Sequence, residues 1–454
     1  MRKMKRLQDE SRSGMLAYRY DRAEAPDAKG VKDSGIEWIG QIPSDWKCCK
    51  QKYLITLLNG RAYKDSEFEE DGKYKILRVG NLFTNPVWYS SSLELEPNKY
   101  CQDGDLLYSW SMSYAPVIWH GEKVIYHYHI WKTVLSEKIG KMFAYYYLIS
   151  LTNALQAEIH ETTMGFITMG VMNNAYIAFP PLAEQQKIAD FLDAKCADID
   201  QIRADIEKQI EILTDYKKSV ITEAVTKGLD PKVKMKDSGI KWIGKIPEHW
   251  GVIRLKNASW LKGRIGWQGL RAEEFTDEGP FLITGTDFKN GYVDWNTCVH
   301  ISEQRFNQDL AIQIKENDLL ITKDGTIGKL AIAKNCPEKV SLNSGVFIIR
   351  NTGKYKYDDK FMYYLLQSRE FTLWFDLSNA GNSTICHLNQ EKFYNFKFAY
   401  PPLPEQKKIA DYLDEKCSEI DATIADKQRQ LETLDEYKKS LIFEYVTGKK
   451  EVPT

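Results

Sequence analysis

A block of sequence that occurs twice constrains this chain more than any other feature. The first copy, residues 180–226, begins Pro-Pro-Leu-Ala-Glu-Gln-Gln-Lys-Ile-Ala, and the second, residues 401–447, begins Pro-Pro-Leu-Pro-Glu-Gln-Lys-Lys-Ile-Ala. The offset of 221 residues is the same from 180 and 401 through to 226 and 447, so no residue has been gained or lost within the block. A solvated loop does not need such exact spacing, and the block therefore indicates a packed element.

Each copy is predicted to form one long helix. Apolar residues recur at every seventh position with further apolar residues between them, which is the a/d seam of a coiled coil. Pro-Pro is a helix start signal, and Gly228 with Pro231 supplies a stop for the first copy. At about 1.5 Å per residue, each helix would be roughly 65 Å long. The predicted seam positions are Leu192, Ile199, Ile206, Leu213 and Val220 in the first copy and Leu413, Ile420, Lys427, Leu434 and Leu441 in the second.

A narrow apolar seam needs a partner, and the closest candidate for each helix is the other copy. The alternative is a pair of unrelated amphipathic helices, each packed into a globular core. Lys427 interrupts the second seam. It is either a polar residue that sets the register of the pair or a surface residue whose aliphatic stem covers the seam.

Two further repeats indicate that the whole unit is duplicated. Residues 32–46 return as residues 236–250 with the shared pattern Lys-Asp-Ser-Gly-Ile-x-Trp-Ile-Gly-x-Ile-Pro-x-x-Trp, whose tryptophans are expected to pin the entrance of each module to its body. A helical pattern at 143–150 returns at 361–368. We therefore predict a tandem duplication of a globular module followed by a helix. The predicted parts are an arm (1–30), a first module (31–179), a first helix (180–228), a second module (229–400) and a second helix with a tail (401–454).

Between these shared ends the two modules differ. Short runs bounded by turn residues predict strands, at 105–114 and 124–131 in the first module and at 318–329 and 340–350 in the second. Each module is therefore expected to be mixed α/β, and the whole chain falls in the α+β class. The helix and entrance patterns are the same in both modules, whereas the loops differ. This combination is typical of one scaffold used to recognise two different ligands.

Composition describes a soluble globular protein of 454 residues, with 43% hydrophobic and 28% charged residues. We find no apolar run long enough to span a bilayer and no signal peptide, so we expect a cytoplasmic protein without a membrane partner. The eight cysteines include no Cys-x-x-Cys and are expected to be reduced packing residues. The formal net charge of −1 excludes a uniformly basic surface, although the predicted helices are acidic and the remainder is slightly basic.

No catalytic, cofactor or metal motif is recognised. Gly325-x-x-Gly328-Lys329 lacks the glycine spacing and the following Ser/Thr of a phosphate loop, and neither an Asn-Pro-Pro-aromatic nor a Gly-x-Gly-x-x-Gly motif occurs. His127 and His129 are predicted to alternate along one strand and to face one side. They are a metal pair lacking a visible third ligand, a surface polar contact or a buried hydrogen-bonded pair. We expect no catalysis, no cofactor and no metal.

The aromatic residues give the remaining signal. All twelve tryptophans lie outside the predicted long helices, and several stand beside cationic or hydrogen-bonding residues in predicted loops. Such mixtures are used for phosphate and base-edge contacts. The alternative is that most of these tryptophans are core residues.

Several of these motifs together resemble one known family. The entrance pattern, Asp-Leu-Leu-Tyr-Ser-Trp-Ser at 105–111, Thr-Lys-Asp-Gly-Thr-Ile-Gly at 322–328 and Pro-Pro-Leu-x-Glu-Gln-x-Lys-Ile-Ala at each helix are similar to the specificity subunits of type I restriction-modification systems. The resemblance covers residues 32 to about 448. It implies two target-recognition domains joined by two helices in an antiparallel coiled coil, a pseudo-twofold dumbbell.

The resemblance also implies a function. Such a subunit has no catalysis of its own and recognises a bipartite site on double-stranded DNA. It positions two methyltransferase subunits and, in the full complex, the restriction subunits that carry the motor and nuclease. The rival hypotheses are a nuclease with an unrecognised site and a coiled-coil scaffold or nucleic-acid-binding subunit of another assembly.

The family pattern does not assign base-contacting residues, so the DNA-binding candidates are chosen by composition in the predicted loops. They are Arg61, Tyr63, Lys64, Tyr108, Trp110, Tyr114, His127 and His129 in the first module, and Arg264, Trp267, Thr284, Thr286, Lys323, Thr326, Lys329, Ser344, Ser383 and His387 in the second.

Overall fold

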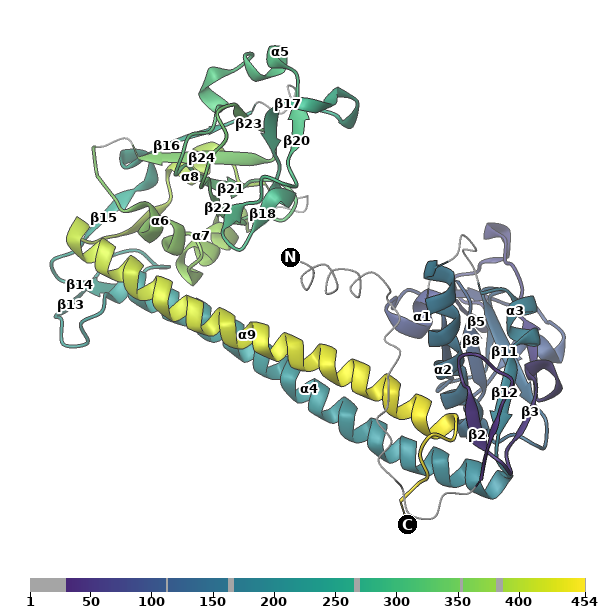
Figure 1. Cartoon of the computed structure of the whole chain (residues 1–454). Helices are drawn as coiled ribbons and strands as arrows, with labels where there is room; N and C mark the ends of the chain where they lie inside the picture. Colours follow the sequence, from purple (N-terminus) through teal and green to yellow (C-terminus); the bar gives the residue numbers. More distant parts are fainter. Residues whose placement is uncertain are drawn as a thin grey trace, which may run out of the picture. The chain divides into compact units, whose positions relative to one another are not determined.

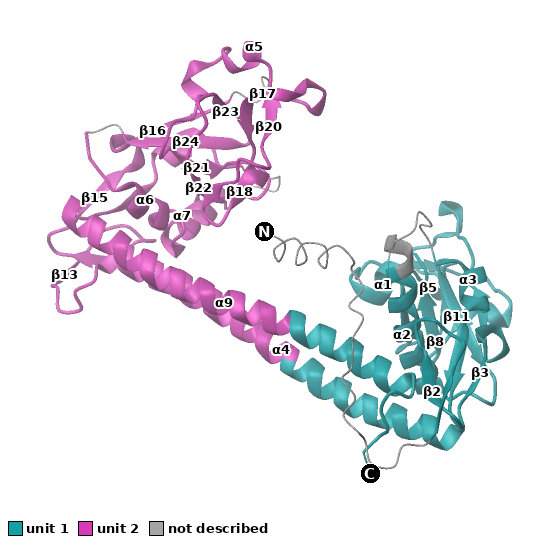
Figure 2. Ribbon diagram, viewed as in Figure 1, with its two compact units in different colours: residues 1–202, 432–454 teal, residues 203–431 magenta. Residues whose placement is uncertain are grey.

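The chain divides into two compact units (Figure 2). The computed structural model describes residues 30–453 except 112, 162–166, 265–269, 352–353 and 381–386. Unit 1 comprises residues 1–202 and 432–454, and unit 2 comprises residues 203–431. Each unit therefore holds one module and a part of each long helix. The predicted arm, apart from Gly30, lies outside the described residues.

The two predicted long helices are present. Helix α4 spans Leu182–Lys227 and has 46 residues, and helix α9 spans Leu403–Val446 and has 44 (Figure 1). Helix α4 ends at the residue before Gly228, whose φ of 76° is the left-handed conformation that commonly follows a helix. The predicted start and stop signals of the first helix are thereby confirmed.

In unit 1 the first turns of α4 pack against the last turns of α9. Ile188, Leu192 and Ile199 share one buried core with Leu441 and Val446. At its edge, Lys438 Nζ lies 2.5 Å from Asp200 Oδ1. The N-terminal part of one helix therefore meets the C-terminal part of the other.

In unit 2 the remaining parts of the same helices also pack together. Val225 of α4 shares a buried core with Ile409 and Leu413 of α9. An ion pair joins Lys217 Nζ to Asp421 Oδ2 at 2.6 Å. The seam positions Leu192, Ile199, Ile206, Leu413, Ile420 and Leu441 are buried, whereas Leu213, Val220, Lys427 and Leu434 are half-buried.

The first module is built from two four-stranded sheets with the orders β4-β11-β8-β9 and β6-β5-β10-β7, and from the pairs β1-β2 and β12-β3. All pairs are antiparallel except β5 with β10. Helix α2 supplies core residues such as Phe143 and Tyr147. The strands are β1 Val31–Asp33, β2 Gln41–Pro43, β3 Lys47–Lys50, β4 Ile55–Asn59, β5 Tyr74–Leu77, β6 Tyr89–Ser91, β7 Tyr100–Cys101, β8 Leu106–Ser109, β9 Ala115–Ile118, β10 Val124–Tyr126, β11 Ile130–Leu135 and β12 Tyr176–Phe179, and the helices are α1 Val79–Phe83, α2 Lys141–Glu161 and α3 Met169–Asn174.

The second module repeats this plan with a larger main sheet. That sheet has the order β16-β24-β21-β22-β19-β18, and beside it lie the sheet β20-β17-β23 and the pairs β13-β14 and β15-β25. The strands are β13 Met235–Asp237, β14 Lys245–Pro247, β15 Gly251–Arg254, β16 Ser259–Gly263, β17 Phe275–Ile283, β18 Phe288–Lys289, β19 Tyr292–Val293, β20 Val299–Ile301, β21 Leu319–Thr322, β22 Leu330–Ile332, β23 Val340–Leu342, β24 Val346–Asn351 and β25 Lys397–Tyr400, and the helices are α5 Glu303–Phe306, α6 Asp359–Leu365, α7 Arg369–Asn379 and α8 Gln390–Tyr394.

The shared strand order confirms that the two modules are mixed α/β copies of one plan. The entrance tryptophans also match, because Trp46 and Trp250 are each 1% exposed and donate to Glu184 Oε1 and Glu405 Oε2 at 3.2 and 2.8 Å. The predicted helix at 361–368 is only partly correct. Helix α6 ends at Leu365 and α7 begins at Arg369, whereas α2 is continuous.

Candidate nucleic-acid interface

One turn in each module carries the chain from one sheet to the other, and we call it the crossover turn. In the first module it is residues 127–129, between β10 and β11, which belong to different sheets. The prediction that His127 and His129 alternate along one strand is therefore wrong. Three backbone bonds fix the turn, from His127 N to Leu77 O at 2.9 Å, from Tyr128 N to Arg61 O at 3.1 Å and from Trp110 N to His129 O at 3.1 Å.

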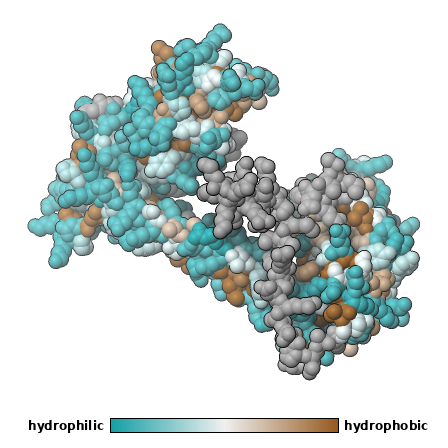
Figure 3. All heavy atoms as spheres, in the orientation of Figure 1, coloured by the Kyte–Doolittle hydropathy of each residue, from teal (hydrophilic) through white to brown (hydrophobic). Residues whose placement is uncertain are grey.

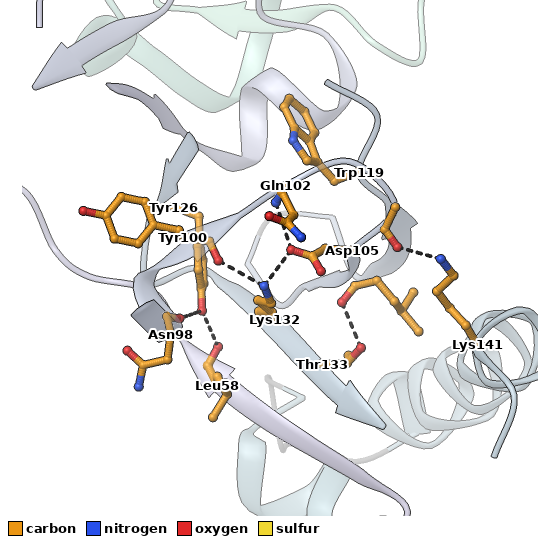
Figure 4. Close-up of polar contacts among 12 residues, drawn as sticks. Leu58, Asn98, Tyr100, Gln102, Asp105, Trp119, Tyr126, Lys132, Thr133 and Lys141 are labelled. Carbon is orange, nitrogen blue, oxygen red and sulfur yellow. Dashed lines mark hydrogen bonds and ion pairs between the residues drawn. The ribbon is translucent and has the colours of Figure 1, made fainter. Parts of the chain in front are cut away.

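Polar contacts in the strands on either side hold this turn in place (Figure 4). Tyr126, at the end of β10, donates through its hydroxyl to Asn98 O at 2.7 Å. Lys132, on β11, lies 2.6 Å from Asp105 Oδ2 and 3.1 Å from Tyr100 O. These contacts tie the two strands that flank the turn to residues 98–105 and do not involve the side chains of the turn itself.

Aromatic and imidazole rings gather on the first crossover turn. The His127 and His129 rings are 4.7 Å apart, and the Tyr128 ring lies within 4.4 Å of both. The Trp110 indole stands edge-on to His129 at 5.2 Å and donates to Tyr128 O at 2.7 Å. Tyr128 is 38% exposed and the two histidines are half-buried, so the cluster reaches the surface.

The electrostatic surroundings keep both imidazoles neutral at pH 7. Partial burial, then the neighbouring His129 and Arg78, lower the pKa of His127 to about 4. Burial and Arg78 also lower the pKa of His129 below its usual value. Arg78 was not among the sequence candidates, since nothing in its local sequence links it to residues 50 positions away.

The second module has its crossover turn at residues 343–345, between β23 and β24. The backbone bonds are the same in kind, from Asn343 N to Ile283 O at 2.9 Å and from Lys323 N to Gly345 O at 2.8 Å. Ser344 lies on this turn. Thr284, which follows Ile283 as Arg78 follows Leu77, joins its hydroxyl to that of Thr286 at 2.7 Å. Four candidates from separate stretches, Thr284, Thr286, Lys323 and Ser344, therefore belong to this turn and its hydrogen-bonded neighbours.

A carboxylate accompanies the cations beside the second crossover turn. Asp324 Oδ2 lies 2.7 Å from Lys323 Nζ, and Asp324 Oδ1 lies 2.5 Å from His387 Nδ1. Although partial burial acts to raise it, these two hydrogen bonds hold the pKa of Asp324 below its usual value. Thr326 and Lys329 lie exposed on the loop that follows. The pairing of Asp324 with two candidate residues could not be anticipated from the sequence.

Two candidates prove to be core residues, and their prediction as DNA contacts is wrong for this conformation. Tyr108 is fully buried, and its hydroxyl lies 2.9 Å from that of Thr152. Arg264 is 2% exposed and donates to Leu342 O and Ser341 Oγ at 2.9 and 3.1 Å, so it supports the strand before the second crossover turn. Both lie in loops or strands rich in polar neighbours, which is why composition alone selected them.

The other candidates of the first module lie beside its crossover turn or at the surface. Arg61 forms a bridge with His127 in the backbone, and its guanidinium pairs with Glu67 at 2.5 Å and covers the half-buried Tyr63 ring. Lys64 is exposed, and Tyr114 is half-buried.

Two candidates of the second module, Trp267 and Ser383, lie outside the described residues.

No group of three or more His, Cys, Asp or Glu residues within the described part of the chain could hold a metal ion. None of the helices in that part combines the length and apolar character needed to cross a membrane. The visible face of unit 2 is mostly hydrophilic, with scattered hydrophobic residues (Figure 3).

A second surface feature is repeated in both units. In unit 1 a cleft beside the helices is lined by Tyr145, Tyr146, Asp193 and Cys196, with Tyr146 donating to Asp193 Oδ1 at 2.6 Å. In unit 2 the corresponding residues line a cleft of the same kind, and Tyr364 donates to Asp414 Oδ1 at 2.8 Å. The matched residues of the second cleft are Tyr363, Tyr364, Asp414 and Cys417. The chain therefore keeps these four matched residues in both halves while its crossover turns differ.

The known proteins to which this chain is similar belong to one family. The family model described as the type I restriction modification DNA specificity domain matches the chain twice, over residues 43–212 and 248–433. The type I restriction enzyme MjaVIII specificity subunit of Methanocaldococcus jannaschii is 27% identical over 421 residues, which cover 90% of this chain and 94% of that protein. The EcoBI specificity subunit of Escherichia coli is 24% identical over 407 residues, 87% of this chain and 84% of that protein.

A solved structure supports the fold. A chain from a study of complex assembly and conformational transition of the type I restriction-modification system aligns with a TM-score of 0.64 and 15% identity. The alignment covers 90% of this chain and 99% of that chain.

Proposed function

The chain belongs to the type I restriction modification DNA specificity family, as a specificity subunit, and from this membership we propose that each of its modules reads one half of a bipartite DNA target. One observation carries the proposal. Two modules whose equivalent strands have the same order present crossover turns with different side chains, His-Tyr-His in the first and Asn-Ser-Gly in the second. Recognition of two different half-sites requires different contacting side chains, which a shared scaffold can hold in equivalent positions.

Each crossover turn is proposed to enter a major groove, where side chains can distinguish base pairs. Hydroxyl, amide and ammonium groups supply donors and acceptors for the base edges, and neighbouring cations and imidazoles contact phosphates. The residues that remain candidates are Arg61, Tyr63, Lys64, Trp110, Tyr114, His127 and His129 for one half-site, and Thr284, Thr286, Lys323, Thr326, Lys329, Ser344 and His387 for the other, with Trp267 and Ser383 as predictions from sequence.

The two long helices are proposed to form one antiparallel coiled coil that joins the target-recognition domains in a pseudo-twofold arrangement. Support comes from each unit separately, where the N-terminal part of one helix packs on the C-terminal part of the other. The ion pairs Lys217–Asp421 and Lys438–Asp200 are related by the offset of 221 residues, as a twofold relation requires. The base pairs between the two half-sites then remain unread.

The subunit is proposed to have no catalysis of its own and to position two methyltransferase subunits, with restriction subunits joining in the full complex. The duplicated cleft supports two copies of one partner, because Tyr146, Asp193 and Cys196 are matched by Tyr364, Asp414 and Cys417. A surface that differed between the halves would suit two different partners. Action on cellular DNA places the protein in the cytoplasm.

The proposal is tested by co-expressing the chain with a methyltransferase subunit of its family and mapping N6-methyladenine across a genome. A single bipartite motif is expected. Replacing residues 48–179 with the same region of another family member should then change one half of the motif and leave the other unchanged. Methylation without sequence preference, or a change in both halves together, would contradict the proposal of two readers.

A further inference from the structure

The first crossover turn has an unusual charge arrangement. Arg78, His127 and His129 come from two segments joined by the backbone bond from His127 N to Leu77 O. The guanidinium of Arg78 lies 5.1 Å from the centre of the Tyr89 ring and forms no ion pair with a carboxylate in the described part of the chain. Neither histidine of the turn forms one there either. The two imidazoles are in contact, and the positive charge of Arg78 acts on both, without an ion-paired carboxylate in the described part of the chain.

The remaining groups around the turn do not change this balance. Arg61 is already paired with Glu67, and the Tyr63 ring is stacked beside His127 at 6.4 Å. Tyr126 donates its proton to backbone oxygens, and Tyr128 is a neutral ring between the two imidazoles. Burial raises the pKa of the Tyr63 and Tyr126 hydroxyls, so neither supplies negative charge.

We propose that Arg78, His127 and His129 form a protonation-coupled clamp for a phosphate of the DNA backbone, so that the first module grips its half-site more tightly as the pH falls. This inference rests on the proposed function. A phosphate supplies the anion that the cluster lacks, and Arg is well suited to bind it. The exposed Tyr128 at the tip of the turn leaves the cluster open to a large ligand.

Protonation follows from the same geometry. In the free protein the low pKa values of His127 and His129 keep the rings neutral at pH 7. A phosphate within about 4–6 Å favours the charged form and raises a pKa by about 1–3 units. Each ring whose pKa rises in the complex takes up a proton on binding, which strengthens binding at low pH and is lost as the pH rises through the pKa of the bound state.

The second crossover turn provides a contrast within the same molecule. Its nearest groups are the Thr284, Thr286 and Ser344 hydroxyls, which do not titrate, and His387 is paired with Asp324. The pH dependence of DNA binding is therefore assigned to the first half-site.

The test uses the full chain in complex with its methyltransferase subunits and a duplex that carries the mapped target. We expect binding to be roughly 4-fold to 25-fold tighter at pH 5.5 than at pH 7.5, which corresponds to a rise of about two to three units in the pKa of His127 from its value of about 4 in the free protein. The double variant His127→Gln, His129→Gln should lose this pH dependence, so that its affinity is the same at both pH values. The variant His120→Gln is the matched control, since His120 is exposed in the same module and lies near Asp103, and it should keep the full dependence.

A second arm identifies the ligand group. Duplexes with single neutral methylphosphonates along the first half-site should include one position that flattens the pH dependence as the double variant does. Histidine ring resonances of the native protein give a readout that needs no variant to fold, because only seven histidines are present. Two of them should show raised pKa values when the duplex is added.

The outcomes separate the two proposals. Sequence-selective binding whose pH dependence survives in the double variant, or that no methylphosphonate alters, would overturn the clamp and leave the proposed function intact. Absence of sequence-selective binding by the native complex at every pH would overturn both.

Discussion

The two crossover turns share two backbone hydrogen bonds to neighbouring segments but differ in charge. In the first module, two histidines and Arg78 stand together without a carboxylate among the described residues. In the second, hydroxyl groups line the turn and Asp324 neutralises Lys323. After the duplication, the backbone bonds that position the turn were preserved, whereas the side chains on and beside the turn changed.

The preserved part includes an ion pair at the start of equivalent strands. Lys132 on β11 pairs with Asp105 before β8, and Arg350 on β24 pairs with Asp318 before β21. Each carboxylate also accepts a backbone N–H, from Gln102 in the first module and from Lys315 in the second. The second pair is the more buried, since the Asp318 side chain is 6% exposed and that of Asp105 is 22% exposed.

The largest expected effect comes from breaking these ion pairs. Asp318→Asn should destabilise unit 2 by roughly 2–4 kcal/mol, because it leaves the Arg350 charge without its partner in a mostly buried position. Asp105→Asn should cost less, about 1–2 kcal/mol, because water reaches the Asp105 carboxylate more readily than that of Asp318. Calorimetric unfolding of the full chain measures both. Equal losses would show that burial does not distinguish the two pairs.

Much of the scaffold could be predicted from the sequence. The duplicated block predicted both long helices, because a seven-residue apolar spacing and Pro and Gly boundaries are local signals. The entrance repeat predicted the tryptophan contacts for the same reason. The division into two modules followed from the offsets between repeats, and the equivalent strand orders confirm that both copies fold alike.

The interface was predicted less well, because it depends on contacts between distant segments. The sequence placed His127 and His129 on one strand, since it does not reveal that β10 and β11 belong to different sheets. Tyr108 was selected because its neighbours in the sequence are polar. Alternation along a strand predicts that one face is exposed, whereas all four residues of β8 are buried. Arg78 was missed, because the backbone bond that brings it to the turn is not visible in the sequence.

The next effect concerns a second difference between the modules. Thr152, whose hydroxyl meets Tyr108, is replaced in the second module by Glu370, and Tyr108 by Ile321. Glu370 is 1% exposed, its carboxylate oxygens have no side-chain partner in the described residues, and burial raises its pKa well above the usual value. The folded state therefore holds a proton that the unfolded state releases, and stability falls as the pH rises above the unfolded-state pKa.

Glu370→Gln should remove the loss of stability that Glu370 causes at high pH. The variant should stabilise unit 2 by about 1–2 kcal/mol at pH 8, with a smaller gain at pH 5. Thermal unfolding at the two pH values measures the effect. Glu391→Gln is the control, because Glu391 is exposed on α8, and it should change neither value. A gain of the same size at both pH values would mean that packing rather than protonation is responsible.

A smaller effect is expected from making the second turn resemble the first in charge. Asp324→Asn leaves Lys323 and His387 without their carboxylate. DNA binding by the complex should become about threefold tighter at low salt. The slope of log affinity against log salt concentration should steepen by the amount expected for at most about one additional phosphate contact. Weaker binding with an unchanged slope would show instead that Asp324 holds Lys323 in its contacting position.

The smallest effect concerns the stability of the first module in acid. The pKa of His127 is about 4 in the folded protein, below the value near 6.5 of an unfolded chain. Between these values the unfolded state binds more protons, so stability is complete above about pH 6.5 and is lost as the pH falls toward 4. His127→Gln should make unit 1 more stable than the native protein at pH 5, by less than about 1 kcal/mol because the ring is half exposed, and equal to it at pH 7.5. Chemical unfolding at both pH values measures the difference, with His300→Gln in the second module as the control. A variant that is less stable at both pH values would show that the ring packing of His127 with Tyr128 outweighs the cost of protonation.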